Sequence, residues 1–290
     1  LSKVSKFFSS LFNVDASLAK QASLLSKFDL VSEMVGEFPE LQGIMGAHYT
    51  KLNGKPNEVS NAIFEQYKPK GISNDMPKTN LGGMLSIIDN IDTLTGFFII
   101  NKKPSGSKDP FALRRSGFSI VQILMEFKLN ISISDLFNEA LKSYKNSSKN
   151  VKLDLTDFII DKVKFFLRKL NIRDDIIESI LSLEEAPNYT FSILYERTKH
   201  INDIKHSNDF ELFLVNFKRL NNIIKTSKFS VISDVEVDFD LFNSSEEENL
   251  YNKHQGLKVN LEKYLRDIDY QKSLLDEIVK LNNVINSFFE

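Results

Sequence analysis

The sequence predicts an all-α protein. In most segments longer than about ten residues, apolar side chains recur every three or four residues, which is the period of an amphipathic helix. Only two short stretches, 97–100 and 229–232, have the character of strands, and no internal repeat is found. The chain has 290 residues, which is enough for two domains with separate cores.

The first half of the chain contains four predicted helices and a broken stretch. Asp15 can cap a helix over 15–35, in which Leu18, Ala22 and Leu25 share a face with Asp29. Proline and glycine interrupt the next segment, so we expect a turn and a short helix there. The remaining helices are predicted over 57–67, 80–95 and 110–128.

The second half continues the helical pattern. Helices are predicted over 136–144, 157–170, 172–183, 190–205, 208–227, 247–266 and 270–289. In the helix over 208–227 two stripes are expected. The apolar stripe predicts a core face with Phe210, Phe213, Phe217, Leu220 and Ile224, and the polar stripe is Lys218, Asn222 and Lys225.

Composition limits the classes of function. The net charge is −2, so binding to nucleic acid must come from local clusters of cations. The chain has no cysteine, which excludes disulfides and zinc–thiolate sites. It begins with leucine and has neither a secretory signal nor an apolar run long enough for a membrane span, so we interpret it as part of a longer cytosolic protein.

A basic loop is the first candidate site. Residues 101–109 contain Lys102, Lys103 and Lys108, and Asp109–Pro110 has the residue types that begin a helix. Such a helix points free N–H groups and a partial positive charge at the loop, with Arg114 and Arg115 in its first turns. The pattern predicts an anion site on a helical scaffold.

Three charged residues are expected inside the fold. Asp29 and Asp92 fall on apolar faces of predicted helices, and Arg114 lies in line with Phe118. A buried charge is costly unless it is paired. We therefore predict structural ion pairing among Asp29, Asp92 and Arg114, while Arg115 faces solvent.

No catalytic residue or metal ligand is assigned. The sequence lacks nucleophile motifs and glycine-rich phosphate loops, and its four histidines have no partner at ligand spacing. Ser26–Lys27, His48 and Asp89 follow the layout of an HD-type metal phosphohydrolase, but Ser26–Lys27 stands where that family has His–Asp. This region resembles an HD scaffold without its metal site.

Several longer segments together resemble one family. They are LLSKFDLV (24–31), EFPELQGIMG (37–46), DNIDTL (89–94), KDPFALRR (108–115) and FKRLNNI (217–223). In this order they resemble the β subunit of the bacterial, heterotetrameric glycyl-tRNA synthetase, strongly to about residue 125 and more loosely afterwards.

The resemblance implies the following organisation. An HD-like helical domain without hydrolytic ligands covers 1–150, a helical linker 151–187, and an anticodon-binding bundle similar to that of arginyl-tRNA synthetase 188–290. The β subunit's N-terminal half and last helices would lie outside the chain. The α subunit of an α2β2 enzyme would hold the adenylate-forming site and its ATP, and this chain would bind tRNA(Gly) without cofactor in the cytoplasm.

The resemblance also carries site residues. Lys218, Arg219 and Asn222 match the family's KR-x-x-N segment, and with Lys225 they form an outward stripe suited to RNA. In the first domain we assign RNA contact to Lys102, Lys103, Lys108 and Arg115. Two alternatives stay open: an HD-family phosphohydrolase acting on a nucleotide, and a structural module that docks partner subunits. A solvated helix face is the simplest alternative for the stripe.

Overall fold

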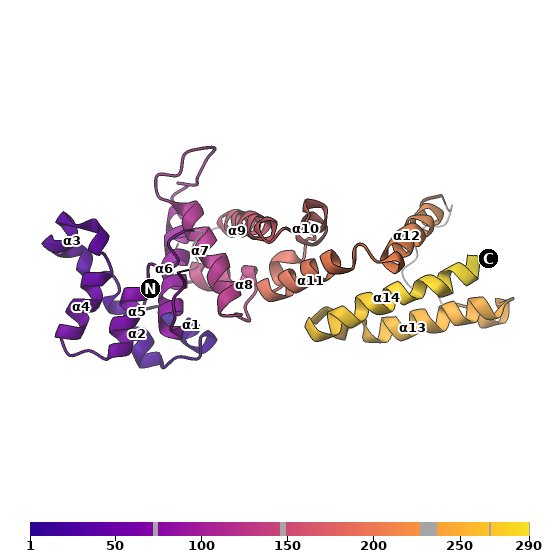
Figure 1. Ribbon diagram of the computed structural model, residues 1–290, viewed down its shortest axis with the longest axis horizontal. Coiled ribbons are helices and arrows are strands. Elements are labelled where there is room, and N and C mark those ends of the chain that lie inside the picture. The colour runs from indigo at the N-terminus through magenta and orange to yellow at the C-terminus, as the bar shows by residue number, and fades with distance from the viewer. Residues whose placement is uncertain (72–74, 146–148, 227–236, 267, 290) are drawn as a thin grey trace. The chain divides into compact units, whose positions relative to one another are not determined.

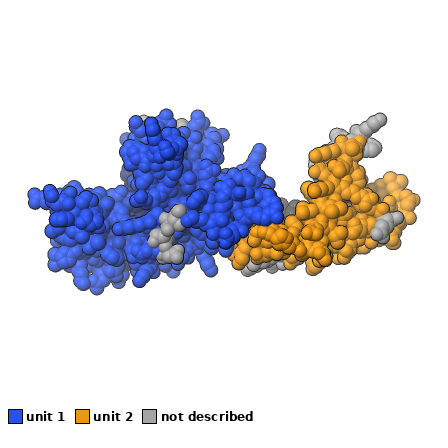
Figure 2. Space-filling model, turned by 45° about the horizontal axis from the view of Figure 1, so that its top comes forward, with its two compact units in different colours: residues 1–195 blue, residues 196–290 orange. Residues whose placement is uncertain are grey.

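The structure is a computed structural model that describes residues 1–71, 75–145, 149–226, 237–266 and 268–289 (Figure 1). The described residues contain helices and no strand, which confirms the predicted all-α class. The chain divides into two compact units, residues 1–195 and 196–290 (Figure 2). None of the described helices is both long and apolar enough to cross a membrane.

Unit 1 is built around one central helix, α6 (Asn80–Ile99). This helix is apolar on nearly all sides, so it can be covered all round. The helices that pack against it are α1 (Ser5–Leu11), α2 (Ala16–Leu25), α5 (Asn57–Glu65), α7 (Leu113–Glu126), α8 (Ile133–Leu141) and α9 (Lys149–Lys169). The core of the unit therefore surrounds α6, and its fully buried side chains include Met84, Leu85 and Ile88.

Shorter elements complete unit 1. They are η1 (Phe28–Val31), α3 (Glu33–Glu37), η2 (Pro39–Leu41), α4 (Ile44–Leu52), α10 (Asp174–Leu181) and η3 (Ala186–Asn188). The helix predicted over 15–35 is thus divided among α2, η1 and α3. A new helix begins there because the Ser32 side chain accepts a hydrogen bond from the Val35 N–H and caps α3.

One local prediction differs from the structure. Residues 97–100, expected to be extended, are the last three residues of α6 and its C-cap, Ile100, and Phe98 is buried there against the Phe158 ring of α9. Tertiary packing of the aromatic ring outweighs the strand propensity of the run. The other expected strand, 229–232, lies outside the described residues. Residues 151–187, predicted to be a helical linker, contain most of α9 and all of α10, and they fall within unit 1.

Unit 2 consists of helices as well. Helix α11 (Phe191–Ile204) contains the boundary, and it is followed by α12 (Asn208–Thr226), η4 (Phe239–Leu241), α13 (Ser245–Arg266) and α14 (Ile268–Phe289). Helix α14 packs against both α12 and α13. The contact between α12 and α14 includes a buried polar pair, in which the Asn216 Nδ2 donates to the Asn282 Oδ1 at 3.3 Å.

Candidate nucleic-acid interface

The basic loop lies between α6 and α7 and projects from the helices of unit 1 (Figure 1). Its tip is a tight turn, because the backbones of Ser105 and Lys108 exchange hydrogen bonds of 3.1 and 2.8 Å. Lys102, Lys103 and Lys108 are all exposed. The turn therefore displays three cations to solvent, where phosphate groups can reach them.

The start of α7 differs from the prediction. The helix begins at Leu113 rather than at Asp109–Pro110. Its N-cap residue, Ala112, has left-handed backbone angles and no side chain that can cap. The Asp109 carboxylate takes that role, accepting hydrogen bonds from the N–H groups of Leu113 at 2.8 Å and Arg114 at 3.0 Å. These N–H groups are occupied by the protein's own carboxylate, so they are not offered to an external anion.

The predicted ion pairing is wrong, since neither Asp29 nor Asp92 pairs with Arg114 among the described residues. The Arg114 guanidinium donates through Nη2 to the Gly106 carbonyl at 2.5 Å, which ties the basic loop to α7. The Asp92 carboxylate accepts from the Tyr144 hydroxyl at 2.8 Å. The Arg114 guanidinium and the Asp92 carboxylate are thus each bound to a neutral hydrogen-bonding group rather than to an opposite charge.

A pocket of about 340 Å³ lies where α7 meets α9, and we call it the α7–α9 pocket. Its lining residues are Gly71, Arg114, Arg115, Phe118, Lys162 and Phe165. Three cations and two phenyl rings thus converge from two helices. Gly117 permits the close crossing, because a Cβ there would lie 2.8 Å from the Phe158 ring. Sequence reasoning missed Lys162 and Phe165, which nothing in the local pattern of α9 distinguishes.

The electrostatics of the α7–α9 pocket favour an anion. Burial lowers the pKa of Lys162, the Arg114 charge lowers it further, and the carboxylates of Asp161 and Asp109 partly oppose this shift. Burial is the largest cause, so the lowered pKa reports an ammonium withdrawn from water, and a bound anion would offset that cost. Phe165 is 42% exposed and meets the Phe118 ring edge-on at 5.1 Å between centroids. An exposed ring beside cations suits a stacked base with its phosphate.

The lysines of the basic loop differ in whether their ammonium groups have partners within the protein. Lys103 is ion-paired with Asp154 of α9, and its ammonium lies 5.9 Å from the centroid of the Phe98 ring. For the Lys102 and Lys108 side chains, no partner is found among the described residues. Lys103 therefore anchors the loop to α9, and the other two ammonium groups are available to a ligand.

The residues of unit 2 that the sequence analysis assigned to RNA contact all lie on α12. Lys218, Arg219, Asn222 and Lys225 are all exposed. The Arg219 guanidinium stacks 3.9 Å from the centroid of the Phe289 ring, near the end of α14. Cation–π stacking holds the guanidinium in place without using its hydrogen-bond donors.

The predicted core stripe of α12 is only partly correct. Phe217 is 54% exposed and Ile224 is also exposed, whereas Asn216 is the buried residue of the helix. The buried face of α12 includes Asn216 instead of Phe217 and Ile224, because the Asn216 amide pairs with Asn282 of α14. The Asn282 Nδ2 in turn donates to the Asp209 carbonyl at 2.7 Å. A satisfied amide pair sets the contact, which hydrophobic periodicity alone does not reveal.

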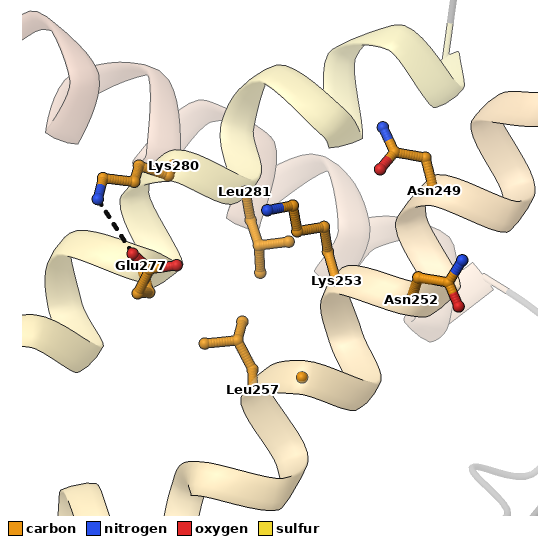
Figure 3. Close-up of a pocket in the computed structure, with 8 residues that line it drawn as sticks. Asn249, Asn252, Lys253, Leu257, Glu277, Lys280 and Leu281 are labelled. Carbon is orange, nitrogen blue, oxygen red and sulfur yellow. Dashed lines mark hydrogen bonds and ion pairs between the residues drawn. The ribbon is translucent and has the colours of Figure 1, made fainter.

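A groove of about 430 Å³ runs between α13 and α14 in unit 2 (Figure 3). Asn249, Asn252 and Lys253 line it from α13, and Lys280 lines it from α14, where its ammonium pairs with Glu277 at 3.0 Å. Amide and ammonium groups of this kind suit a polar or anionic ligand, but the Glu277 carboxylate offsets part of the charge. Sequence reasoning did not single out this groove.

The position where the sequence resembles an HD metal site holds an ion pair. The Lys27 ammonium lies 2.5 Å from the Asp89 Oδ1. An ammonium there opposes a second cation, because like charges repel. Among the residues that the structure describes, no three histidine, aspartate or glutamate side chains lie close enough together to hold a metal ion. The geometry therefore does not favour the metal-dependent phosphohydrolase alternative.

Comparison with known proteins identifies the family. The family model described as glycyl-tRNA synthetase beta subunit matches residues 1–182, which is more than half of the chain. The chain belongs to the glycyl-tRNA synthetase β-subunit family. This finding confirms the resemblance inferred from the sequence segments.

Curated relatives agree with this assignment. The chain is similar to the glycine–tRNA ligase beta subunit of Ruegeria sp., with 40% identity over 74% of this chain and 30% of the relative. It is similar to that of Clostridioides difficile with 35% identity over 93% of this chain and 38% of the relative. It is also similar to that of Coxiella burnetii, with 34% identity over 100% of this chain and 42% of the relative. The chain thus spans well under half the length of these relatives.

The segment EFPELQGIMG, which helped to identify the β-subunit family, has a structural role. The fully buried Asp29 carboxylate accepts hydrogen bonds through Oδ2 from the N–H groups of Gly43 at 2.7 Å and Gly46 at 3.0 Å, at the start of α4. Gly43 has a φ of +82°, and a Cβ on Gly46 would lie 2.9 Å from that oxygen. Both glycines are needed because the carboxylate approaches the backbone closely.

Proposed function

We propose that this chain is the tRNA-binding part of a glycine–tRNA ligase β subunit. It would support the ATP-dependent attachment of glycine to tRNA(Gly), carried out in the cytoplasm with the α subunit in an α2β2 enzyme. The α subunit would bind ATP, and this chain would need no cofactor. Family membership supports this role, and the cations that converge on the α7–α9 pocket support binding to RNA.

The observation that carries the proposal is the α7–α9 pocket. Arg115 and Lys162 approach from two different helices, and the exposed Phe165 ring lies beside them. Converging cations bind phosphate more strongly than the same number of separate lysines, because the packed helices have already paid their ordering entropy. Lys102 and Lys108 on the basic loop would extend the contact along the RNA backbone.

Binding of tRNA(Gly) to the purified chain tests this directly. We expect the double substitution of Arg115→Met and Lys162→Met to weaken binding about tenfold or more, since each lost phosphate contact is a charge-assisted hydrogen bond. The salt dependence is the sharper measurement. The slope of log K against log salt concentration should fall by about 1.5 when two phosphate contacts are removed.

A matched control separates local contact from net charge. Lys142 and Arg173 are exposed in unit 1, and each pairs with its own neighbour, Glu139 and Asp175 respectively. The double substitution Lys142→Met and Arg173→Met removes the same formal charge but lies outside the pocket. Equal losses of affinity and slope in both double variants would refute a specific site in the α7–α9 pocket.

The α12 stripe is proposed as a second contact. Lys218, Asn222 and Lys225 follow one another at spacings of four and three residues, which places them on one side of α12, and all three are exposed. Replacing Lys218 and Lys225 by methionine should weaken tRNA binding by about three- to tenfold, a smaller effect, because flexible exposed lysines lose entropy on binding. An unchanged affinity and salt slope would show that the stripe is a solvated helix face.

One observation also favours a docking role. In and around η1, α3 and α4, large apolar side chains are exposed, and Val31 is 91% exposed and Phe38 51%. These elements contact one another, so the side chains form one region of the surface. We propose that the α subunit covers this region in the assembled enzyme. Substituting Val31→Asp should abolish co-purification with the α subunit and leave tRNA binding unchanged.

A further inference from the structure

A second pocket in unit 1 shares Arg115 with the α7–α9 pocket. It has a volume of about 330 Å³, and we call it the α6–α7 pocket. Pockets of this size bind small molecules in other proteins. The residues that matter for its chemistry are Gln66, Lys70, Asp89, Asn90 and Arg115.

Gln66 leaves a buried hydrogen-bond acceptor unused. The residue is 1% exposed, and its Nε2 donates to the Ser26 carbonyl at 2.5 Å. Its Oε1 is buried and has no hydrogen-bond partner among the described residues. Buried polar atoms in native proteins are nearly always satisfied, so this oxygen points to a missing donor.

The neighbouring residues of α6 also present acceptors. The Asp89 carboxylate is buried and meets the Lys27 ammonium through Oδ1, and no hydrogen bond to its Oδ2 is found in the described part of the chain. The Asn90 Nδ2 donates to the Ser86 carbonyl at 2.9 Å, so its amide oxygen is the group left for a ligand. The wall of the pocket is therefore rich in acceptors and calls for a ligand with several N–H groups.

Arg115 and Lys70 add positive charge to the lining of the pocket. Both residues are exposed cations. Arginine binds phosphate oxygens in a fork-shaped arrangement, and lysine acts as a point charge. The pocket thus combines acceptors for N–H groups with cations for a phosphate, which matches a nucleotide whose base has an amino group.

We propose that the α6–α7 pocket binds one nucleotide whose base carries an exocyclic amino group. The base edge donates to Asp89 and Gln66, and the phosphate lies on Arg115 and Lys70. Guanine fits best, because its ring N–H and its amino group are adjacent donors, one for the Asp89 Oδ2 and one for the Gln66 Oε1. Uracil has a single ring N–H between two carbonyl oxygens and fits least. Where the nucleotide belongs to an RNA, this inference rests on the proposed function.

The first arm of the test uses free mononucleotides. Amide NMR spectra of the intact chain are recorded with GMP, CMP, AMP, UMP and ribose 5-phosphate at increasing concentration. We expect GMP to shift the signals of Gln66, Asp89 and Arg115 and to bind at least about fivefold more tightly than UMP. Ribose 5-phosphate should shift Arg115 without shifting Gln66.

The second arm uses short single-stranded RNA with one guanosine, and the same RNA with an abasic site in its place. If the nucleotide comes from RNA, the abasic site should weaken binding about tenfold, and Asp89→Asn should remove that difference. The control is Asp92→Asn, the same change on the same helix outside the pocket. If GMP binds but the abasic site and Asp89→Asn leave RNA binding unchanged, the occupant is a free mononucleotide.

Two results would overturn the inference. One is the absence of shifts at Gln66 and Asp89 with every mononucleotide, combined with equal RNA affinity for the wild type and Asp89→Asn. The other is equal affinity for GMP and UMP. If tRNA(Gly) still binds with its dependence on Arg115 and Lys162, the proposed function survives this failure. If tRNA(Gly) does not bind at all while GMP does, the proposed function fails, and the inference that the α6–α7 pocket binds a nucleotide stands.

Discussion

The two units hold their cations in different ways. In unit 1, Arg115 and Lys162 come from helices that pack closely at Gly117, so the charges converge on one pocket. In unit 2, Lys218 and Lys225 lie in a row on α12, a helix whose inward contact includes an asparagine pair and whose Phe217 ring is exposed. Tertiary packing creates the first site, whereas helical spacing alone creates the second. The first should therefore bind with a few strong contacts and the second with several weak ones.

The largest expected effect concerns the scaffold of unit 1. Asp29→Ala removes the carboxylate that accepts from the Gly43 and Gly46 N–H groups and leaves two buried donors unsatisfied. We expect unit 1 to lose about 2–4 kcal/mol of stability. Denaturant unfolding, followed by probes placed in each unit, should show that unit 2 is unaffected. Asp157→Ala, an exposed aspartate of α9, is the control and should change stability by less than about 0.5 kcal/mol.

A smaller effect is expected in unit 2. Asn282→Ala removes the bonds to Asn216 and to the Asp209 carbonyl, and we expect a loss of about 1–3 kcal/mol in the stability of that unit. Asn283→Ala, at an exposed neighbouring position, serves as the comparison. If thermal unfolding of unit 2 shifts equally in both variants, the amide pair does not determine the contact between α12 and α14.

The same contrast explains what the sequence could predict. Periodicity located most helices, and α5, α11, α12 and α14 end within about two residues of their predicted limits, because each has a clear apolar repeat. Periodicity failed where a side chain forms hydrogen bonds with residues that are distant in the sequence. Asp29 appeared to need an opposite charge, but its partners are two backbone N–H groups of α4.

In the candidate site, too, the residues close together in sequence could be predicted and those brought in by tertiary packing could not. The loop lysines and Arg115 could be named from the sequence, since cations beside a turn are visible in the local pattern. Lys162 and Phe165 could not, because they reach the site only through the crossing of α7 and α9. The register of α12 was missed for a related reason, since the buried Asn216 reads as a polar surface position in any hydrophobic pattern.

The pH dependence of Asp89 gives a third prediction. Burial raises the pKa of this carboxyl above its usual range, and the nearby Lys27 charge partly offsets the shift. The folded chain therefore holds a proton that the unfolded chain has lost, so the contribution of Asp89 to stability falls as the pH rises through the raised pKa. Lys27→Met should raise the pKa further and move this loss to higher pH.

Carboxyl NMR titration of the wild type and of Lys27→Met measures that shift. Lys142→Met removes an equivalent charge from α8's end and should leave the Asp89 titration unchanged. The effect on stability should be smaller than that of Asp29→Ala, because the Lys27 side chain is 42% exposed and water screens the pair. A lower pKa of Asp89 in Lys27→Met would contradict the assigned ion pair.

The smallest expected effect tests whether Arg219 belongs to the scaffold or to the proposed RNA-binding surface of unit 2. Its guanidinium stacks on the Phe289 ring, and exposed cation–π contacts contribute about 0.5–1 kcal/mol. Arg219→Ala should therefore lower the stability of unit 2 by up to about 1 kcal/mol, whereas Lys218→Ala should leave it within about 0.5 kcal/mol. Arg219→Lys should retain the charge but weaken the stacking. If Arg219→Ala reduces tRNA affinity and Arg219→Lys restores it, the charge contacts RNA, and stacking on Phe289 positions it to do so.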